Sequence, residues 1–493
     1  MSLAVATALA VALRVPMLTQ PMTADEGGYA GVARGWAAGA RLYRDVWVDR
    51  PQGLLVLYRF TDWIDGGHAI GIRVLAILFG VGLVWATAWA VRGLAGAAAG
   101  GAAAILTAAV TAVPVLEGFA ANGELLAGTF AALCVALCVA AKNRSVWWRW
   151  VACGLAGGVA MSFKQSGFDG AVAVLVWLAA VAVLGPSRRR AVHRLVLVLA
   201  GVLAPLVLLA VHGALLGWDR WLAAMGSYRL RAQSAVSAAD WDNLVRTAKV
   251  AEPILGAVAA AAVIGAAVAP RMVRAHGPGG AGRSWIVLVA WPLAAAAGFI
   301  SGGGFWRHYW VQLGAPIAAL AGVGIAWLLA AARWRSIAVA ALVAPSIVAT
   351  GWVTAAPREQ WIVRANDDWR SPLDARVAAW LSDHDVGGAD VYPLCAAAGL
   401  YGDAALVPRY PYLWMVEVHE APGAADGLVA YLGDQGRAPE YVAQYQPAQS
   451  CDGSGRLQAV LDRHYSSVAT LGAVTILRRD LADTGTRAAV RRE

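Results

Sequence analysis

Charged side chains are scarce in this sequence: Asp, Glu, Lys and Arg make up 14% of its 493 residues, whereas soluble domains contain about 25%. Hydrophobic residues reach 59%. Runs of about 20 apolar residues, the length of a membrane-spanning helix, recur through residues 1–355. These features exclude a large soluble helical protein. They predict a polytopic, all-α membrane protein over residues 1–355.

Several other signals are missing. The net charge is +9, yet no basic-aromatic motif is present, and many basic residues stand in short loops where the positive-inside rule explains them. No nucleic-acid partner is therefore expected. No internal repeat is visible, which argues against the inverted repeats of many transporters. The first apolar run lacks a basic start and a small-residue cleavage site, so we expect a retained anchor.

About eleven spans are expected from the length criterion. Their approximate limits are 2–20, 69–91, 97–115, 123–141, 149–163, 168–185, 195–217, 251–269, 285–302, 311–331 and 336–355. Every second loop is short and basic, beginning with Arg92 and Lys142, and is predicted to be cytoplasmic. The N-terminus is then inside and the C-terminus outside. Loop 218–250 is basic although it faces out, and longer outer loops follow the rule poorly.

Residues 356–480 have a different composition, with charges, turn residues and short apolar runs. Strand-like and helix-like segments alternate there, which predicts a small α/β or α+β domain outside the cytoplasm. Residues 481–493 are expected to be a disordered tail. Five cysteines are present. Cys395 and Cys451 lie in this outer region, where an oxidising environment favours a disulfide between them.

The first outer loop, residues 21–68, is unusually charged. It contains "TADEGGYAGVARGWAAGARLYRDVWVDRPQGL", with Asp25 and Glu26 directly after the first span. Two short helical patterns in it, "GGYAGVARGWAAG" and "PQGLLVLYRFTDWI", are predicted to lie along the membrane interface. An ordinary solvated loop is the alternative. Because ionisable groups are costly at the membrane edge, we expect a functional loop.

Three further outer turns contain polar residues of the same kind. One brings Glu117, Asn122 and Glu124; the next brings Lys164, Gln165 and Asp169; the last brings Arg307, His308, Tyr309 and Gln312. A single Lys or His at a helix end is often only an interfacial anchor. Carboxylates, a lysine and an Arg-His-Tyr cluster on one face of the membrane instead indicate an active site.

The order "DEGGYA", "LYRDVW", "RPQG", "ANGELL", "FKQ" and "RHYWVQLGAP" resembles the GT-C superfamily of integral membrane glycosyltransferases. It is most similar to the protein O-mannosyltransferases and lipid A aminoarabinose transferases. The resemblance covers about residues 1–355 and is strongest over 20–60. Where members of these families often have "KPPG", this chain has "RPQG". Gln52 thus replaces a rigid proline, so this loop need not contact the same part of the substrate.

The resemblance implies inverting transfer of a sugar from a polyprenyl phosphate to a hydroxyl group on the outer face. It implies that Asp25 is the general base, with Glu26 beside it, because an acceptor hydroxyl must lose its proton as the bond forms. Glu124 is the candidate second acid. The leaving phosphate needs positive charge, and its candidate ligands are Lys164, Arg307, His308, Arg229 and Arg231. Candidate substrate-binding residues are Tyr29, Tyr43, Arg44, Asp45, Arg50, Gln165, Tyr309 and Gln312.

The sequence has no DxD motif, and a monophosphate leaving group does not require a divalent ion. No cofactor or metal is therefore expected, although Glu124 and His308 leave metal binding open. The expected partners are the polyprenyl-phosphate sugar, membrane lipid, and a cell-envelope glycan, glycolipid or protein acceptor. Arabinofuranose and mannose are the sugars favoured. Two alternatives remain: a lipid-linked-sugar flippase or other transporter, and an inactive subunit whose outer domain binds a ligand.

Overall fold

The computed structural model describes residues 2–142, 146–185, 187–228, 230, 238–276, 283–329, 331–386, 391–395, 398–434 and 436–480. The chain forms two compact units. The membrane unit comprises Met1–Gln20, Asp49–Asp65 and Ala69–Asp367. The C-terminal unit comprises Pro21–Val48, Gly66–His68 and Asp368–Glu493. The first outer loop, expected to belong with the spans, is thus divided between the two units.

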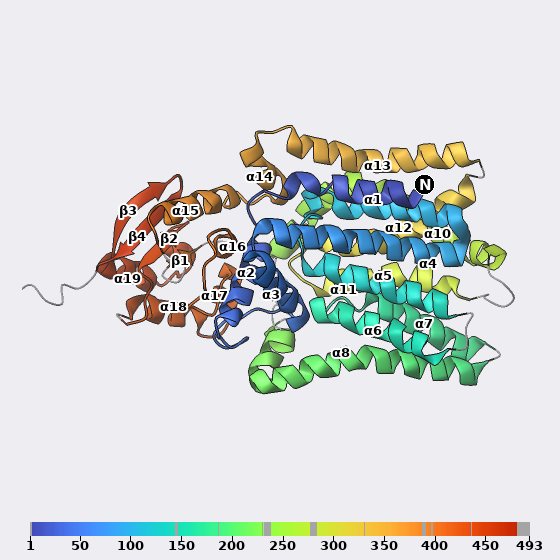
Figure 1. Ribbon diagram of the computed structural model, residues 1–493, viewed down its shortest axis with the longest axis horizontal. Coiled ribbons are helices and arrows are strands. Elements are labelled where there is room, and N and C mark those ends of the chain that lie inside the picture. Colours follow the sequence, from blue (N-terminus) through green and yellow to red (C-terminus); the bar gives the residue numbers. More distant parts are fainter. Residues whose placement is uncertain are drawn as a thin grey trace, which may run out of the picture. The chain divides into compact units, whose positions relative to one another are not determined.

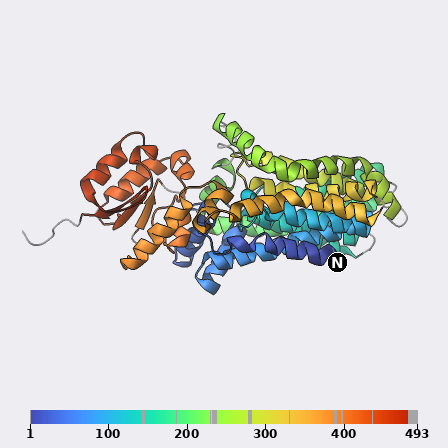
Figure 2. The same ribbon diagram turned by 90° about the horizontal axis from the view of Figure 1, so that it is seen from above.

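The membrane unit is a bundle of helices that run side by side in both views (Figures 1 and 2). Its helices are α1 (Ser2–Ala12), α3 (Gln52–Asp65), α4 (Ala69–Ala112), α5 (Gly123–Ala141), α6 (Trp147–Phe163), α7 (Asp169–Leu184), α8 (Arg188–Leu222), α10 (Ala238–His276), α11 (Trp285–Ser301), α12 (Tyr309–Leu328), α13 (Ala332–Thr354) and α14 (Trp361–Asn366). Short turns η1 (Val15–Met17), η2 (Pro114–Leu116), η3 (Ala223–Ser227) and η4 (Arg358–Gln360) connect them.

The fold class is confirmed as a polytopic helical membrane protein with a small C-terminal sheet. In the described part of the chain, six helices are long and apolar enough to cross a membrane: α4, α5, α8, α10, α12 and α13. Each predicted span overlaps a helix, but α1 is shorter than the predicted span 2–20, and α6, α7 and α11 have fewer than 18 residues. The second and third predicted spans are the two halves of α4, which meet at Gly96 with φ +89°. Only glycine adopts this backbone conformation readily, so the hairpin turns there.

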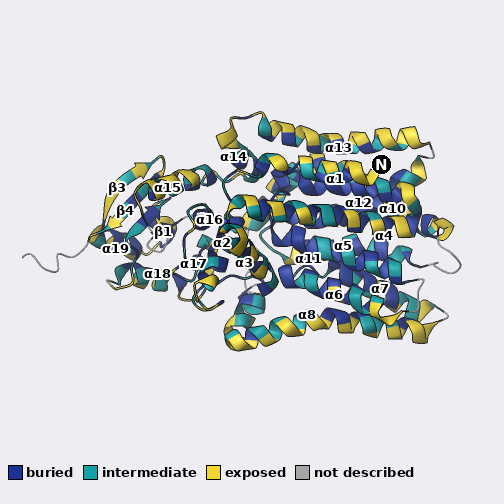
Figure 3. Cartoon of the chain, in the orientation of Figure 1, coloured by how far each residue is buried: buried dark blue, intermediate teal, exposed yellow. Residues whose placement is uncertain are grey.

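The helices of the membrane unit differ in how much of their surface is buried, and apolar residues lie on the exposed helices as well as on the buried ones. α5 and α12 are mostly buried in the bundle, whereas α8 and α13 are mostly exposed (Figure 3). The exposed residues of α8 and α13 include Leu208, Leu215 and Val348. Large apolar side chains on these outer helices suit a lipid environment, in which hydrocarbon surrounds the bundle.

The C-terminal unit contains α2 (Ala24–Ala37), α15 (Ser371–Asp383), α16 (Gly399–Asp403), α17 (Met415–Glu420), α18 (Ala424–Gly433), η5 (Ala448–Ser450) and α19 (Arg456–His464). Its strands are β1 (Val391–Leu394), β2 (Tyr441–Gln444), β3 (Tyr465–Leu471) and β4 (Val474–Arg479), in the order β1-β2-β4-β3. β1 and β2 are parallel, and the other neighbours are antiparallel. The mixed sheet with helices fits the predicted α/β or α+β domain.

A disulfide joins Cys395 to Cys451 across 56 residues of sequence. Both cysteines are buried in the core of the C-terminal unit, which also contains Leu394, Leu428 and Leu457. The bridge ties the segment after β1 to the segment after η5. Closing a loop of this length stabilises a small domain by about 3–4 kcal/mol in the chain-entropy model.

Asp374, in the first turn of α15, is buried and accepts a hydrogen bond from the hydroxyl of Tyr445. Burial raises its pKa well above the ordinary range, and the negative charge of Asp403 raises it further. The folded unit therefore holds a proton that the unfolded chain releases near pH 4. Stability is expected to fall as pH rises from about 4 through the folded-state pKa.

Replacing Asp374 with Asn should remove this pH dependence. The amide oxygen of Asn can accept the hydrogen bond from the Tyr445 hydroxyl, and the amide group carries no charge at any of these pH values. We expect Asp374→Asn to unfold at a higher temperature than the native chain at neutral pH and to show a flatter pH profile. Thermal unfolding of the purified protein between pH 4 and 8 measures both effects. Asp462→Asn, at an exposed residue of the same unit, is the control. An unchanged slope in Asp374→Asn would contradict the prediction.

Candidate active site

Four charged or titratable side chains meet inside the membrane unit, each at the end of a helix or turn. Glu117 follows η2, Glu124 is in the first turn of α5, Lys164 caps the C-terminus of α6, and His308 precedes α12. The Lys164 ammonium forms an ion pair with Glu124. His308 lies between the two acids, with Nδ1 3.2 Å from Glu117 and Nε2 3.7 Å from Glu124. The three turns that the sequence predicts on one face of the membrane thus bring these side chains together.

Helix geometry favours these placements. An acid in the first turn of a helix and a cation at the last turn both complement the helix dipole. Glu124 and Lys164 occupy such positions on neighbouring antiparallel helices. The Lys164 and Glu124 side chains are only 4% and 3% exposed. Buried charges are tolerated when they are paired, and Lys164 also lies 4.0 Å from the ring centre of Tyr309.

Arg50 is linked to the turn that carries Lys164. Its guanidinium is 2.6 Å from Asp49, and the amide of Gln165 donates to the Asp49 carbonyl at 2.8 Å. Arg50 and Gln165, both predicted as substrate-binding residues, are therefore connected through Asp49. This region thus contains two cations, Lys164 and Arg50, each paired with a carboxylate.

A second polar network lies beside the cluster. Gln312 donates from its amide to the Ser166 carbonyl at 2.7 Å and to Asp169 at 3.4 Å, and its oxygen accepts from the Ser166 hydroxyl. Asp169 also accepts from the indole of Trp291 at 2.7 Å. The polar atoms of Gln312, predicted to bind substrate, are thus engaged by the protein itself. The network holds the turn that carries Lys164 against α12.

Arg14 was not anticipated as part of this region. It is buried and donates hydrogen bonds to the carbonyls of Thr111 and Gly118, both at 2.7 Å, and to Ala10. These bonds join the end of α1 to the loop that carries Glu117. In a sequence, a basic residue at the end of an apolar run indicates an anchor at the membrane interface. Only the folded structure shows which carbonyl groups it binds.

The residues predicted to bind the phosphate do not all lie in the charged cluster. Lys164 and His308 are in the cluster. Arg307 instead pairs with Asp367 at 3.1 Å and donates to the Ala365 carbonyl. Adjacent residues at a helix start point in different directions, so His308 and Arg307 separate. Arg229 and Arg231 lie outside the described residues.

Asp25 and Glu26 open helix α2 in the C-terminal unit. Thr23 is the N-cap; its hydroxyl accepts from the Glu26 amide, while the Glu26 carboxylate accepts from the Thr23 amide. This capping box satisfies helix-end donors. Glu26, fully buried, therefore has a structural role that its catalytic prediction did not include. Asp25 is partly exposed at the second position of the helix.

The other predicted residues of the first loop help to shape it. Tyr29 packs on Trp414, with ring centres 5.6 Å apart. Tyr43 has φ +65°, and its amide donates to the Val46 carbonyl, which makes a tight turn. Arg44 and Asp45 form an exposed ion pair at 3.4 Å.

In the described residues, no group of three or more His, Cys, Asp and Glu side chains is arranged to hold a metal ion.

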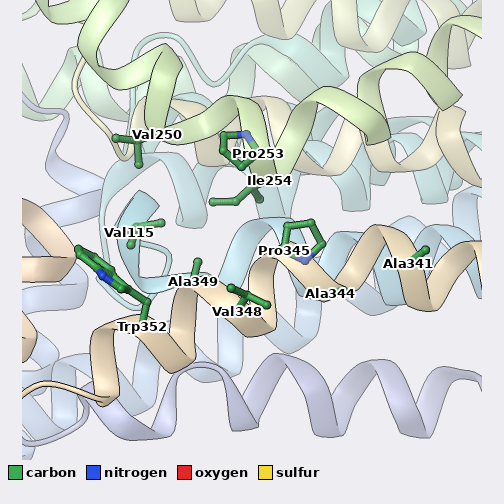
Figure 4. A pocket seen from close by; sticks show the side chains of 10 residues that line it. All are labelled: Val115, Val250, Pro253, Ile254, Ala341, Ala344, Pro345, Val348, Ala349 and Trp352. Atoms are coloured by element: carbon green, nitrogen blue, oxygen red, sulfur yellow. The ribbon is translucent and has the colours of Figure 1, made fainter.

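An apolar crevice of about 530 Å³ lies between α10, α13 and η2 (Figure 4). Its lining is Val115, Val250, Pro253, Ile254, Ala341, Ala344, Pro345, Val348, Ala349 and Trp352. Val115 lies two residues before Glu117, so the crevice reaches the loop that supplies an acid to the charged cluster. Its lining suits a hydrocarbon chain.

Comparison with known proteins matches residues 49–214 to the family dolichyl-phosphate-mannose-protein mannosyltransferase. ArnT from Cupriavidus metallidurans, solved bound to undecaprenyl phosphate, is similar over 97% of both chains, with 14% identity and a TM-score of 0.62. The oligosaccharyltransferase AglB from Archaeoglobus fulgidus, in complex with an inhibitory peptide and a dolichol-phosphate, is similar over 99% of this chain and 74% of its own, with 12% identity and a TM-score of 0.56. No curated protein sequence matches this chain. At these identities the likeness establishes the fold.

Proposed function

We propose that this chain is an integral membrane glycosyltransferase of the GT-C superfamily, and that it transfers a sugar from a polyprenyl phosphate to a hydroxyl group with inversion. The family match over residues 49–214 and the similarity of fold to ArnT support this proposal. The acceptor is a cell-envelope glycan, glycolipid or protein on the outer face of the membrane. The observation that carries the proposal is the buried cluster of Lys164, Glu124 and His308. Solved relatives bound to undecaprenyl phosphate and dolichol-phosphate support a lipid-linked donor.

In the proposed reaction, the acceptor oxygen attacks the anomeric carbon as Asp25 takes the hydroxyl proton. The bond from the anomeric carbon to the phosphate oxygen breaks, and polyprenyl phosphate leaves with the electron pair. Lys164, with His308 beside it, stabilises the negative charge that develops on the phosphate. Glu124 and Glu117 hold Lys164 and His308 in place. The chemistry needs no group beyond these side chains and the two substrates.

The test is transfer of radiolabelled sugar by the purified protein from polyprenyl-phosphate arabinose and polyprenyl-phosphate mannose, with membrane extract as acceptor and EDTA present. Transfer from one donor would support the proposal and identify the sugar. Transfer that occurs without EDTA and is lost in its presence would contradict metal independence. If the protein instead moved the donor across vesicles without transfer, the flippase alternative would replace the enzyme.

The crevice between α10 and α13 is the proposed site for the polyprenyl tail. Ala349→Phe should fill part of it and raise the donor KM about tenfold for long polyprenyl chains, equivalent to ~1.4 kcal/mol of lost binding. A donor with a short prenyl chain should be used equally by both proteins. Ala340→Phe, at an exposed position of α13 outside the lining, is the control. Equal effects on both chain lengths would place the tail elsewhere.

A further inference from the structure

Helix α2 packs closely on α16, a segment more than 360 residues later in the chain. A Cβ atom on Gly27 would lie 2.4 Å from the Gly399 carbonyl oxygen, and one on Gly402 would lie 2.7 Å from the Gly27 Cα. On Gly31 it would lie 2.8 Å from the Tyr401 Cβ. Real Cβ atoms do not approach other atoms so closely. Gly27 and Gly31 of "DEGGYAG" therefore allow close contact with α16, whereas Gly28 faces the ring of Trp414. These contacts differ from the interfacial helix predicted for this stretch.

Hydrogen bonds fix both ends of the same helix. The Asp403 carboxylate, at the end of α16, accepts from the Met22 amide at 3.0 Å. Met22 directly precedes the N-cap Thr23. Near the other end, Arg34 donates to the carbonyls of Tyr401 and Leu406 at 3.0 and 3.3 Å. Residues 401–406 thus hold α2 at its first and last turns.

These contacts determine where Asp25 lies, because it is three residues after Met22 and two before Gly27. A rigid helix whose start, face and end are all held cannot rotate or slide. A general base must reach the proton it removes within hydrogen-bond distance, and a displacement of about 1 Å can cost about 100-fold in rate. Small movements of the α2 start are therefore expected to matter for chemistry.

We infer that Asp403 and Gly402 are positioning residues, through which the C-terminal unit holds Asp25 in its reactive position. This inference rests on the proposed role of Asp25 as the base. It assigns the C-terminal unit a part in the transfer step itself, in addition to any contact with the acceptor. Loss of the Asp403 contact should reduce kcat and leave donor binding unchanged.

The test compares Asp403→Ala, which removes the acceptor for the Met22 amide, with Asp403→Asn, which retains an acceptor oxygen. We expect Asp403→Ala to lower kcat about 10–100-fold with donor KM within about threefold, and Asp403→Asn to recover most of the rate. Gly402→Ala should act like Asp403→Ala, since its new methyl group meets α2. Gly453→Ala, in the same unit with nothing within 4 Å of the added atom, should behave as the native protein.

A double-mutant cycle separates positioning from general destabilisation. Once Asp25→Asn has removed the base, adding Asp403→Ala should lower the residual rate no further. Hydrogen exchange of the α2 amides should also rise in Asp403→Ala and not in Gly453→Ala. Two outcomes would overturn this inference and leave the proposed function standing. One is a native kcat in Asp403→Ala; the other is a double variant whose loss of rate equals the sum of the two single losses. A native protein that transfers no sugar would overturn the proposed function, and this inference with it.

Discussion

Asp25→Asn is expected to lower kcat about 10²–10⁴-fold, the usual contribution of a positioned general base. Asparagine has nearly the shape of aspartate but cannot accept the acceptor's proton. Because Asp25 is partly exposed at the helix start, the exchange should leave the fold and the affinity for polyprenyl phosphate unchanged. Transfer rates at saturating donor, together with binding of polyprenyl phosphate, measure the two effects separately.

Glu26→Gln is the matched control for that experiment. Glutamine can replace glutamate in a capping box, so the hydrogen bond from the Thr23 amide should persist and most activity should remain. This pair of variants distinguishes two adjacent acids that the sequence cannot separate. If Glu26→Gln lost as much activity as Asp25→Asn, the assignment of the base to Asp25 would fall.

Much of the membrane unit follows from hydrophobic length alone. Each predicted span overlaps a helix, although α1 ends well before the predicted limit of the first span. The break between the second and third spans falls at the "RGLAG" stretch that contains Gly96. Apolar run length works well here because lipid requires every backbone group to be satisfied within a helix. The disulfide partners Cys395 and Cys451 were also expected from compartment and position, and the structure joins them.

The site was predictable only in part. Turns on one face of a membrane converge when their helices pack together, and the structure brings Glu124, Lys164 and His308 into contact. Their role in catalysis stays a prediction. Arg307 and His308 are sequence neighbours, yet the direction of each side chain depends on where α12 begins, and Arg307 pairs with Asp367. No local pattern reveals that Gly27 faces Gly402, because that contact joins segments far apart in the chain.

Lys164→Met should have two effects, because Lys164 is both the partner of Glu124 and the proposed phosphate ligand. Methionine keeps the length of the side chain and removes its charge. The buried Glu124 carboxylate then loses its ion pair with Lys164 and keeps only the longer contact with His308. Breaking a buried ion pair costs about 3–5 kcal/mol. We expect a lower unfolding temperature and a loss of transfer of about 100-fold or more, since the leaving phosphate also loses its cation.

A second substitution separates these effects. In Lys164→Met/Glu124→Gln, no buried carboxylate remains at position 124, so most of the lost unfolding temperature should return. Transfer should stay low, because removing Glu124 does not restore positive charge at the phosphate. Thermal unfolding and initial rates of the native protein, the single variants Lys164→Met and Glu124→Gln, and the double variant complete the cycle. If the double variant regained activity along with stability, Lys164 would serve only to neutralise Glu124, and His308 and Arg50 would be left as the candidate ligands of the leaving phosphate.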